Sequence, residues 1–339
     1  MPESAPLVIA VSPYHLVTQE VPALCALLLA DRVTTLMPEP ALGTSREDIA
    51  GAMKRSPRFL RFMERIRWSV PLWNDGVIEA GDDVQSVAEC LGGTYHEITS
   101  GDAVGPLRPM IAKAAAANAD EFLDHLCGDL LKGGPDPAFC VPVNACIDSF
   151  AVRNDLTVAR AVPSSIAQKT ESLMLRRCFA FVMPILKQAS GHRILSTRRA
   201  LLPELSRLRV ILAAAISAWR VQETLRLEPT MANALDDAAK ALTARFEQLK
   251  SDVASGDDDE GRRIIDAYVS VTVMTAPPDA VLRSSTHAAK SAAKRAPVGA
   301  GASRSTAPIT GSPPKAPTDA SVAPLTVMVI KMLNVRPEL

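Results

Sequence analysis

Apolar residues recur at alternating steps of three and four over positions 164–255, which predicts three successive amphipathic helices. The apolar stripe of the third helix contains Met231, Leu235, Ala238, Leu242, Phe246, Leu249 and Val253. The second carries Leu205, Leu208, Leu212, Ile216 and Trp219, with Pro203 in its first turn. The first is expected to begin at Ser165 and to carry Ile166, Leu173, Met174, Phe181 and Ile185. Because such helices need partners, the rest of the chain should pack against them.

Shorter apolar runs near the amino terminus predict strands. Leu7–Val11 and Arg32–Met37 flank an apolar run, Val21–Ala30, that fits a buried helix. Strand, helix and strand in this order are compatible with a parallel βαβ unit. A further strand is expected at Leu156–Val162, where Pro163 ends the run.

The clearest alternation of apolar and polar residues lies at Ile265–Met274 and predicts a strand. A second β-like run covers Leu325–Leu333. Between them, 276–323 is rich in Ala, Pro, Ser, Thr and Gly, a composition typical of disorder. We therefore predict that the two strands are antiparallel neighbours, with 276–323 as a disordered basic insertion. Residues 1–275 and 324–339 should form a single compact domain.

These elements predict an α+β or α/β fold that is helix-dominated, with a small sheet packed against several long amphipathic helices. The chain has 339 residues, of which 47% are hydrophobic and 4% aromatic, enough for a core without disulfides or metal. Its six cysteines are scattered without a CxxC pair and fit buried thiols of a reducing compartment. Its apolar runs are too short to span a bilayer. We expect a soluble, cytoplasmic protein without membrane contact.

The motifs that identify common chemistries are missing from the sequence. It contains no G-x-x-x-x-G-K-[ST], G-x-G-x-x-G, H-E-x-x-H or G-x-S-x-G motif and no EF-hand loop. Gly128 and Gly133 have the spacing of a phosphate-binding loop, but Gly134 stands where that loop needs lysine. The sequence therefore identifies no cofactor, and we assign no metal ligands.

One candidate for proton transfer follows the first predicted strand. If that strand is parallel, His15 and Glu20 lie near its carboxyl end, where open α/β sheets place their sites. A histidine beside a carboxylate can act as a general base. The alternative is an ordinary loop histidine that precedes a helix.

Arginines and tryptophans supply the candidate binding residues. Trp68 and Trp73 lie in an arginine-rich segment, a mixture that can stack on bases but also arises on a helix with buried aromatics. The central candidates are Arg176, Arg177, Arg198 and Arg199. They fit a groove for an anion, or they pair with acidic elements of the same chain. Both alternatives stay open, although we expect both tryptophans to be at least partly buried.

Two functions are compatible with this sequence. The first is a non-catalytic regulatory or interaction protein of unknown partner, in line with the missing motifs. The second is an enzyme acting on an anionic or nucleotide-like substrate, using the loop around His15 and the arginines of the central helices. The basic segment 283–315 would add weak, non-specific binding of nucleic acid. The overall net charge of +0 argues against a protein that coats DNA with its whole surface.

Overall fold

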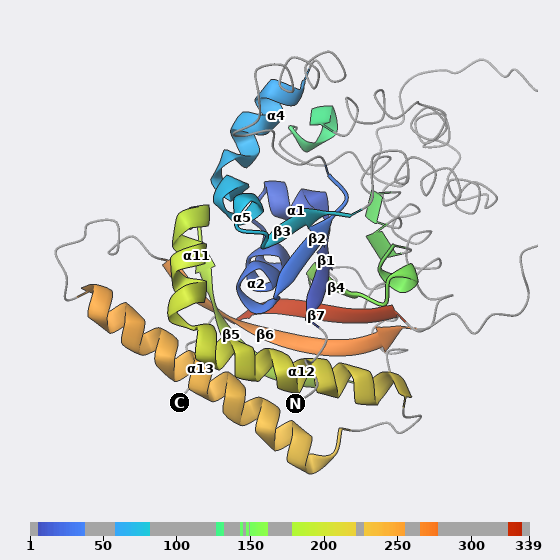
Figure 1. Cartoon of the computed structure of the whole chain (residues 1–339), viewed down its shortest axis with the longest axis vertical. Helices are drawn as coiled ribbons and strands as arrows, with labels where there is room; N and C mark the ends of the chain where they lie inside the picture. The colour runs from blue at the N-terminus through green and yellow to red at the C-terminus, as the bar shows by residue number, and fades with distance from the viewer. Residues whose placement is uncertain are drawn as a thin grey trace, which may run out of the picture.

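A mixed sheet of seven strands forms the centre of the computed structural model (Figure 1). Its strands are β1 (Val8–Val11), β2 (Arg32–Thr35), β3 (Ile78–Ala80), β4 (Thr157–Ala161), β5 (Cys178–Lys187), β6 (Ile265–Ala276) and β7 (Leu325–Leu333). They are arranged in the order β3-β2-β1-β4-β7-β6-β5. The structure describes residues 6–37, 58–81, 127–131, 143–144, 147–148, 150–161, 178–221, 227–254, 265–276 and 325–333.

Helices in the described residues connect and cover these strands. Among them are α1 (Pro13–Val17), α2 (Val21–Leu29), α4 (Phe59–Ile66), the short 3-10 helix η1 (Arg67–Ser69), α5 (Val70–Asn74), α11 (Gly191–Ala200), α12 (Leu202–Val221) and α13 (Pro229–Ala254). The two longest, α12 and α13, pack on each other and cross in front of the β5–β6 end of the sheet (Figure 1). The shorter α1, α4 and α5 lie toward the β1–β3 end (Figure 1).

The first half of the sheet is parallel. β1 pairs in parallel with β2 on one side and with β4 on the other, and β3 extends β2 in the same direction. The predicted βαβ unit is confirmed, because α2 connects the parallel neighbours β1 and β2. The predicted strand at Leu156–Val162 is also confirmed, as β4.

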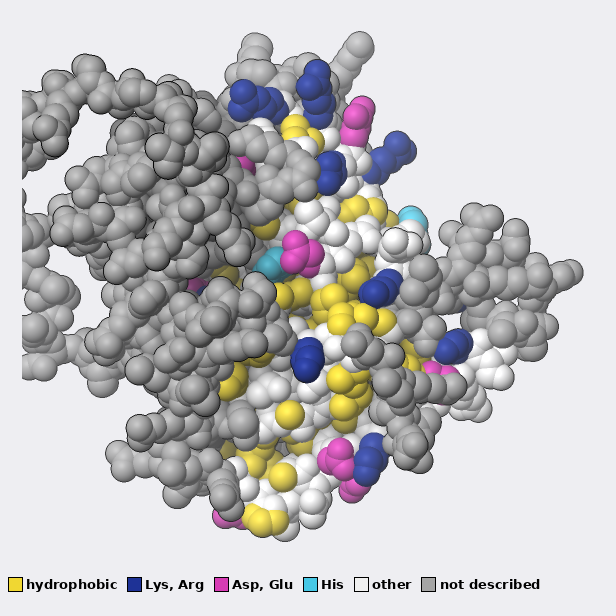
Figure 2. All heavy atoms as spheres, turned by 180° about the vertical axis from the view of Figure 1, so that it is seen from behind, with side chains coloured by type: hydrophobic (Ala, Val, Ile, Leu, Met, Phe, Trp, Pro, Cys, Tyr) yellow, Lys and Arg dark blue, Asp and Glu magenta, His cyan; other side chains and the backbone are white. Residues whose placement is uncertain are grey.

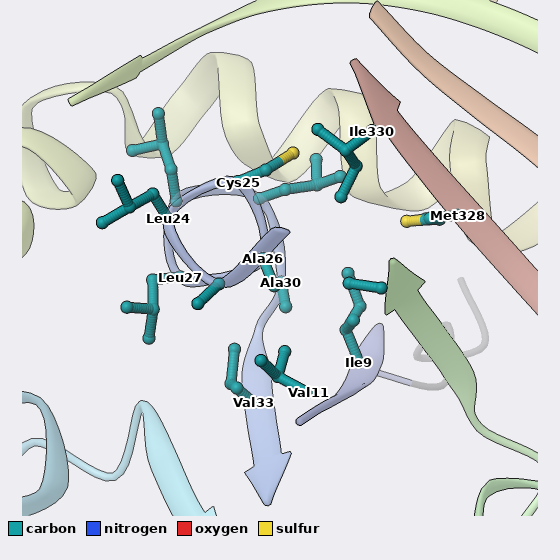
Figure 3. Close-up of a cluster of buried hydrophobic side chains, with 14 of the residues drawn as sticks. Ile9, Val11, Leu24, Cys25, Ala26, Leu27, Ala30, Val33, Met328 and Ile330 are labelled. Carbon is teal, nitrogen blue, oxygen red and sulfur yellow. The ribbon is translucent and has the colours of Figure 1, made fainter. Parts of the chain in front are cut away.

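Helix α2 is buried on all sides, as expected for the crossover of a parallel sheet. Its residues from Pro22 to Leu29 are all buried. Figure 3 shows Leu24, Cys25 and Leu27 of α2 in one cluster with side chains of the parallel strands, among them Ile9, Val33 and Met328. The uninterrupted apolar run in the sequence reflects this burial, because no face of the helix meets water.

The other half of the sheet is antiparallel. β6 pairs with β7 from Tyr268↔Leu333 to Ala276↔Leu325, so the predicted antiparallel pairing of these two strands is confirmed. β7 also pairs in parallel with β4 and thus joins the two halves of the sheet. On its other side β6 pairs with β5 over the whole length of β5.

The predicted fold class is wrong in two respects. The protein is a mixed α/β structure rather than a helix-dominated one, and its sheet has seven strands rather than being small. Phe181 and Ile185, assigned to the first central helix, lie in β5. Pro184 explains this difference, because proline breaks a helix but is tolerated in an edge strand, and β5 is the edge strand here.

The second and third central helices are confirmed as α12 and α13. Their predicted stripes are buried at Leu205, Leu208, Leu212 and Ile216, and at Leu235, Ala238, Leu242 and Phe246. The separate helix α11, with Ser190 as its N-cap, was not predicted. In the described part of the chain, no helix combines the length and apolar character that a membrane crossing requires.

Some predictions fall on residues that the structure does not describe. The insertion predicted to be disordered lies outside the described residues, apart from Ala276. Residues 164–177 of the predicted first central helix also lie outside them. The disorder of the insertion and the single-domain organisation stay predictions.

Candidate functional site

The strand order places a candidate site at the carboxyl ends of β1 and β4. From β1 the chain continues to β2 and β3 on one side, whereas β4 lies on the other side of β1. Open α/β sheets bind their ligands at such a reversal of strand order, beyond the carboxyl ends of the strands. Ser12 and the loop that follows β1 lie at this edge, as does Arg160 near the end of β4.

The loop after β1 turns back on itself in a short distance. Pro13 occupies the start of α1, and this helix ends after Val17. Gln19 then adopts a left-handed conformation with φ of 53°, which is uncommon for a side chain of this kind. The Glu20 amide donates a hydrogen bond to the His15 carbonyl at 2.9 Å, so the turn brings the two residues together.

His15 and Glu20 form a contact pair at the end of this loop. His15 Nε2 lies 3.6 Å from Glu20 Oε2, and the Thr18 hydroxyl donates to Glu20 Oε1 at 3.1 Å. The His15 side chain is 20% exposed and that of Glu20 is 49% exposed. In the view from behind, a histidine and an acidic side chain lie next to each other among hydrophobic side chains (Figure 2). The predicted proximity of the two residues is therefore present in the structure.

Burial controls the charge of His15. Desolvation lowers the pKa of the imidazole, Glu20 opposes this shift, and the nearby Arg160 guanidinium lowers the pKa further. His15 Nδ1 is buried and has no hydrogen-bond partner in the described part of the chain. Nδ1 is therefore turned away from solvent, and Nε2 is the ring nitrogen that faces Glu20.

Arg160 links this pair to a buried carboxylate. Its guanidinium forms an ion pair with Asp148 Oδ2, and the Asp148 side chain is 4% exposed. Burial raises the pKa of Asp148, whereas the charge and hydrogen bond of Arg160 lower it. The second oxygen, Oδ1, is buried without a partner within the described ranges. Asp148 is thus a carboxyl group that takes up a proton more readily than an exposed one.

Two hydrogen bonds fix the loop against segments that precede β4 in the chain. The Ser12 hydroxyl donates to Asn144 Oδ1 at 2.6 Å, and the Tyr14 hydroxyl donates to Asp129 Oδ2 at 2.6 Å. Tyr14 and Asp129 are both buried. These contacts fix Ser12 and Tyr14, the loop residues that precede His15.

The pair Arg198 and Arg209 lies at the other end of α2. Arg198 donates to the carbonyls of Leu27, Leu28 and Asp31, and the Arg209 guanidinium binds the carbonyls of Leu28, Leu29 and Ala30. Arg209 also pairs with Asp31 at 3.0 Å. The last carbonyls of a helix have no partner within the helix, and here two arginines satisfy them. The site around His15 lies at the amino end of α2, so Arg198 does not join it.

The other candidates are also placed apart from His15 or lie outside the described residues. Arg199 forms an exposed ion pair with Asp75 at 2.7 Å. Trp73 is buried in the core, and the half-buried Trp68 packs against the core cluster. The prediction that both tryptophans are at least partly buried is therefore confirmed. Arg176 and Arg177 lie outside the described residues.

Asp148 and Arg160 are the functional candidates that the sequence did not single out. Arg160 stands near the carboxyl end of a correctly predicted strand, so the rule that selected His15 applies to it as well. Asp148 lies in a segment, 139–150, whose pattern fits helix and strand equally, and its contact with Arg160 is visible only in three dimensions.

No cluster of metal-ligating side chains occurs within the described ranges. Comparison with protein-family models, with curated proteins and with solved structures finds no match to this chain.

Proposed function

We propose that the protein is an enzyme acting on a small anionic or nucleotide-like substrate at the carboxyl ends of β1 and β4, with His15 as the proton acceptor. The observation that carries this proposal is the position of a partly exposed imidazole, whose pKa is lowered by burial, beside Glu20 at the reversal of strand order. A general base must be unprotonated at working pH, and burial together with Arg160 favours that state.

Each neighbour of His15 has a separate role in this proposal. Glu20 faces Nε2 and stabilises the imidazolium that forms when His15 accepts a proton. The Arg160 side chain is 32% exposed, so its positive charge can attract an anionic group of the substrate. Asp148, with its raised pKa, can hold a proton beside Arg160. Groups whose pKa values are shifted in one place are typical of acid–base sites.

The experiment is a binding and turnover screen of the full chain with inorganic phosphate, AMP, ATP and NAD. A ligand present at 100 times its Kd raises the free energy of unfolding by about 2.7 kcal/mol. We expect at least one probe to do so, and expect His15→Gln to abolish turnover while Arg160→Met weakens binding. His192→Gln, at an exposed histidine of α11, is the matched control.

Two outcomes count against the proposal. The first is that no probe stabilises the protein, and the second is that the His15 and Arg160 variants respond as the wild type does. Binding without turnover would instead favour the first expectation, a non-catalytic regulatory or interaction protein. That expectation and the binding of nucleic acid by 283–315 stay predictions.

A further inference from the structure

A pocket of about 180 Å³ lies between α11, α13 and the carboxyl end of β5. It is separate from His15, because β5 lies four strands from β1, which at about 4.8 Å per strand is roughly 19 Å. Its volume exceeds that of an apolar cavity of about 150 Å³ that accommodates benzene. The pocket therefore has room for an aromatic ring or for an alkyl chain of similar size.

The floor of this pocket is apolar. Leu186 from β5 and Phe246 from α13 are both buried, and Leu249 lies one turn further along α13. The three side chains come from two elements that pack firmly together, so the floor does not depend on an exposed loop. An apolar group placed on this floor would leave water and gain about 25 cal/mol per Å² of buried apolar surface.

The wall formed by α11 carries a cation that has an unsatisfied donor. Arg193 Nε is buried and has no hydrogen-bond partner in the described part of the chain. A buried donor without a partner costs stability, and an anion in the pocket would pair with the guanidinium that carries it. The guanidinium offers a planar fork that matches the two oxygens of a carboxylate.

The charge around Arg193 limits the ligand to a single negative charge. Lys250 of α13, the other cation that lines the pocket, lies 3.7 Å from Glu247. Glu247 also accepts a hydrogen bond from the Tyr268 hydroxyl. Because Glu247 offsets Lys250, Arg193 would compensate one negative charge, and the second charge of a dianion such as a phosphate monoester would stay uncompensated.

We propose that this pocket binds a small amphiphilic carboxylate, an alkyl or aryl carboxylic acid. Its apolar part would lie on Leu186, Phe246 and Leu249, and its carboxylate would pair with Arg193. The inference does not depend on the proposed function, because the residues of the two sites are different.

The test is a calorimetric titration of the full chain with hexanoate, with its shorter homologues down to propionate, and with hexylammonium. We expect hexanoate to bind, each methylene to tighten binding by about fourfold until the pocket is full, and hexylammonium not to bind. Arg193→Met should weaken hexanoate binding at least about tenfold, as expected for a lost charge-assisted pair. Ala200→Phe fills the pocket from an exposed lining position and should abolish binding.

The matched control is Arg245→Met on α13, whose guanidinium is engaged with Gln248 on the surface. This variant should bind hexanoate as the wild type does. The proposal is overturned if hexanoate does not bind at about 10 mM, or if Arg193→Met and Arg245→Met bind it equally. Equal binding of hexanoate by Ala200→Phe would show that the ligand occupies another place and would also overturn it.

Discussion

Replacing Arg198 by methionine should destabilise the protein by about 3–5 kcal/mol, whereas the same change at Arg199 should cost less than about 1 kcal/mol. The two residues are consecutive in α11 and carry the same side chain. Arg198 is buried and binds carbonyls at the end of α2, whereas the Arg199 side chain is 70% exposed. From the sequence, both arginines were candidates for one anion-binding site, but in the structure they contact different parts of the protein.

The magnitude follows from the hydrogen bonds of Arg198. Its guanidinium donates to the carbonyls of Leu27 and Asp31, with a longer contact of 3.4 Å to Leu28. A hydrogen bond from a charged group contributes about 1.5–3 kcal/mol, so two good bonds give about 3–6 kcal/mol. Burial lowers the pKa of Arg198 to about 10, so the buried charge itself has a cost that methionine removes. This offset brings the expected loss to the lower part of the range.

Urea unfolding followed by circular dichroism measures both variants on one scale. Salt provides a second comparison, because screening weakens the exposed pair of Arg199 and Asp75 but acts little on buried contacts. A difference of less than about 1 kcal/mol between the two variants would refute the reasoning. The buried arginine would then contribute no more than a surface charge.

Three further predictions concern separate parts of the fold. Replacing 277–324 by a six-residue glycine-containing turn should keep the fold, because the strand ends that the turn joins are cross-strand partners. If 277–324 is a flexible chain, this roughly eightfold shortening should also raise the free energy of unfolding by about 2 kcal/mol. Loss of cooperative urea unfolding would contradict this. Trp73→Ala should cost about 3–5 kcal/mol and Trp68→Ala clearly less, because only Trp73 is fully in the core; equal losses in urea unfolding would show otherwise. The pKa of His15 in the folded protein lies below its ordinary value of 6.5, so the unfolded chain takes up the proton first as pH falls. The free energy of unfolding should therefore decrease as pH drops through 6.5 toward the folded pKa. His15→Gln should remove this part of the pH dependence of the urea midpoint.

The parts of the fold that were predicted correctly have local signals. The alternation at Ile265–Met274 and the apolar stripe of α13 each repeat often enough to define one period. The run from Phe179 to Leu186 is apolar throughout and fits either period, and its proline was taken as a kink in a helix rather than as a mark of an edge strand. The strand β3 has three residues, too few to show a period.

The same distinction applies to the candidate site. His15 and Glu20 were predicted together because they are close in sequence and follow a recognisable strand. Arg160 and Asp148 come from a region far along the chain, and the sequence does not show that β4 lies beside β1. The order of strands in a sheet depends on packing between distant segments, which residue periodicity does not encode.

The central position of β7 has a consequence for synthesis of the protein. β7 is made after both of its neighbours, so until Leu325–Leu333 emerges the nascent chain can form only two separate half-sheets, β3-β2-β1-β4 and β6-β5. Translation at about 5–20 residues per second leaves an interval of roughly 2–10 s between completion of β6 and arrival of β7. During this interval β4 and β6 each present an unpaired edge that can pair with another chain. Products released before Leu325 would keep both edges open, and we expect them to aggregate rather than to fold.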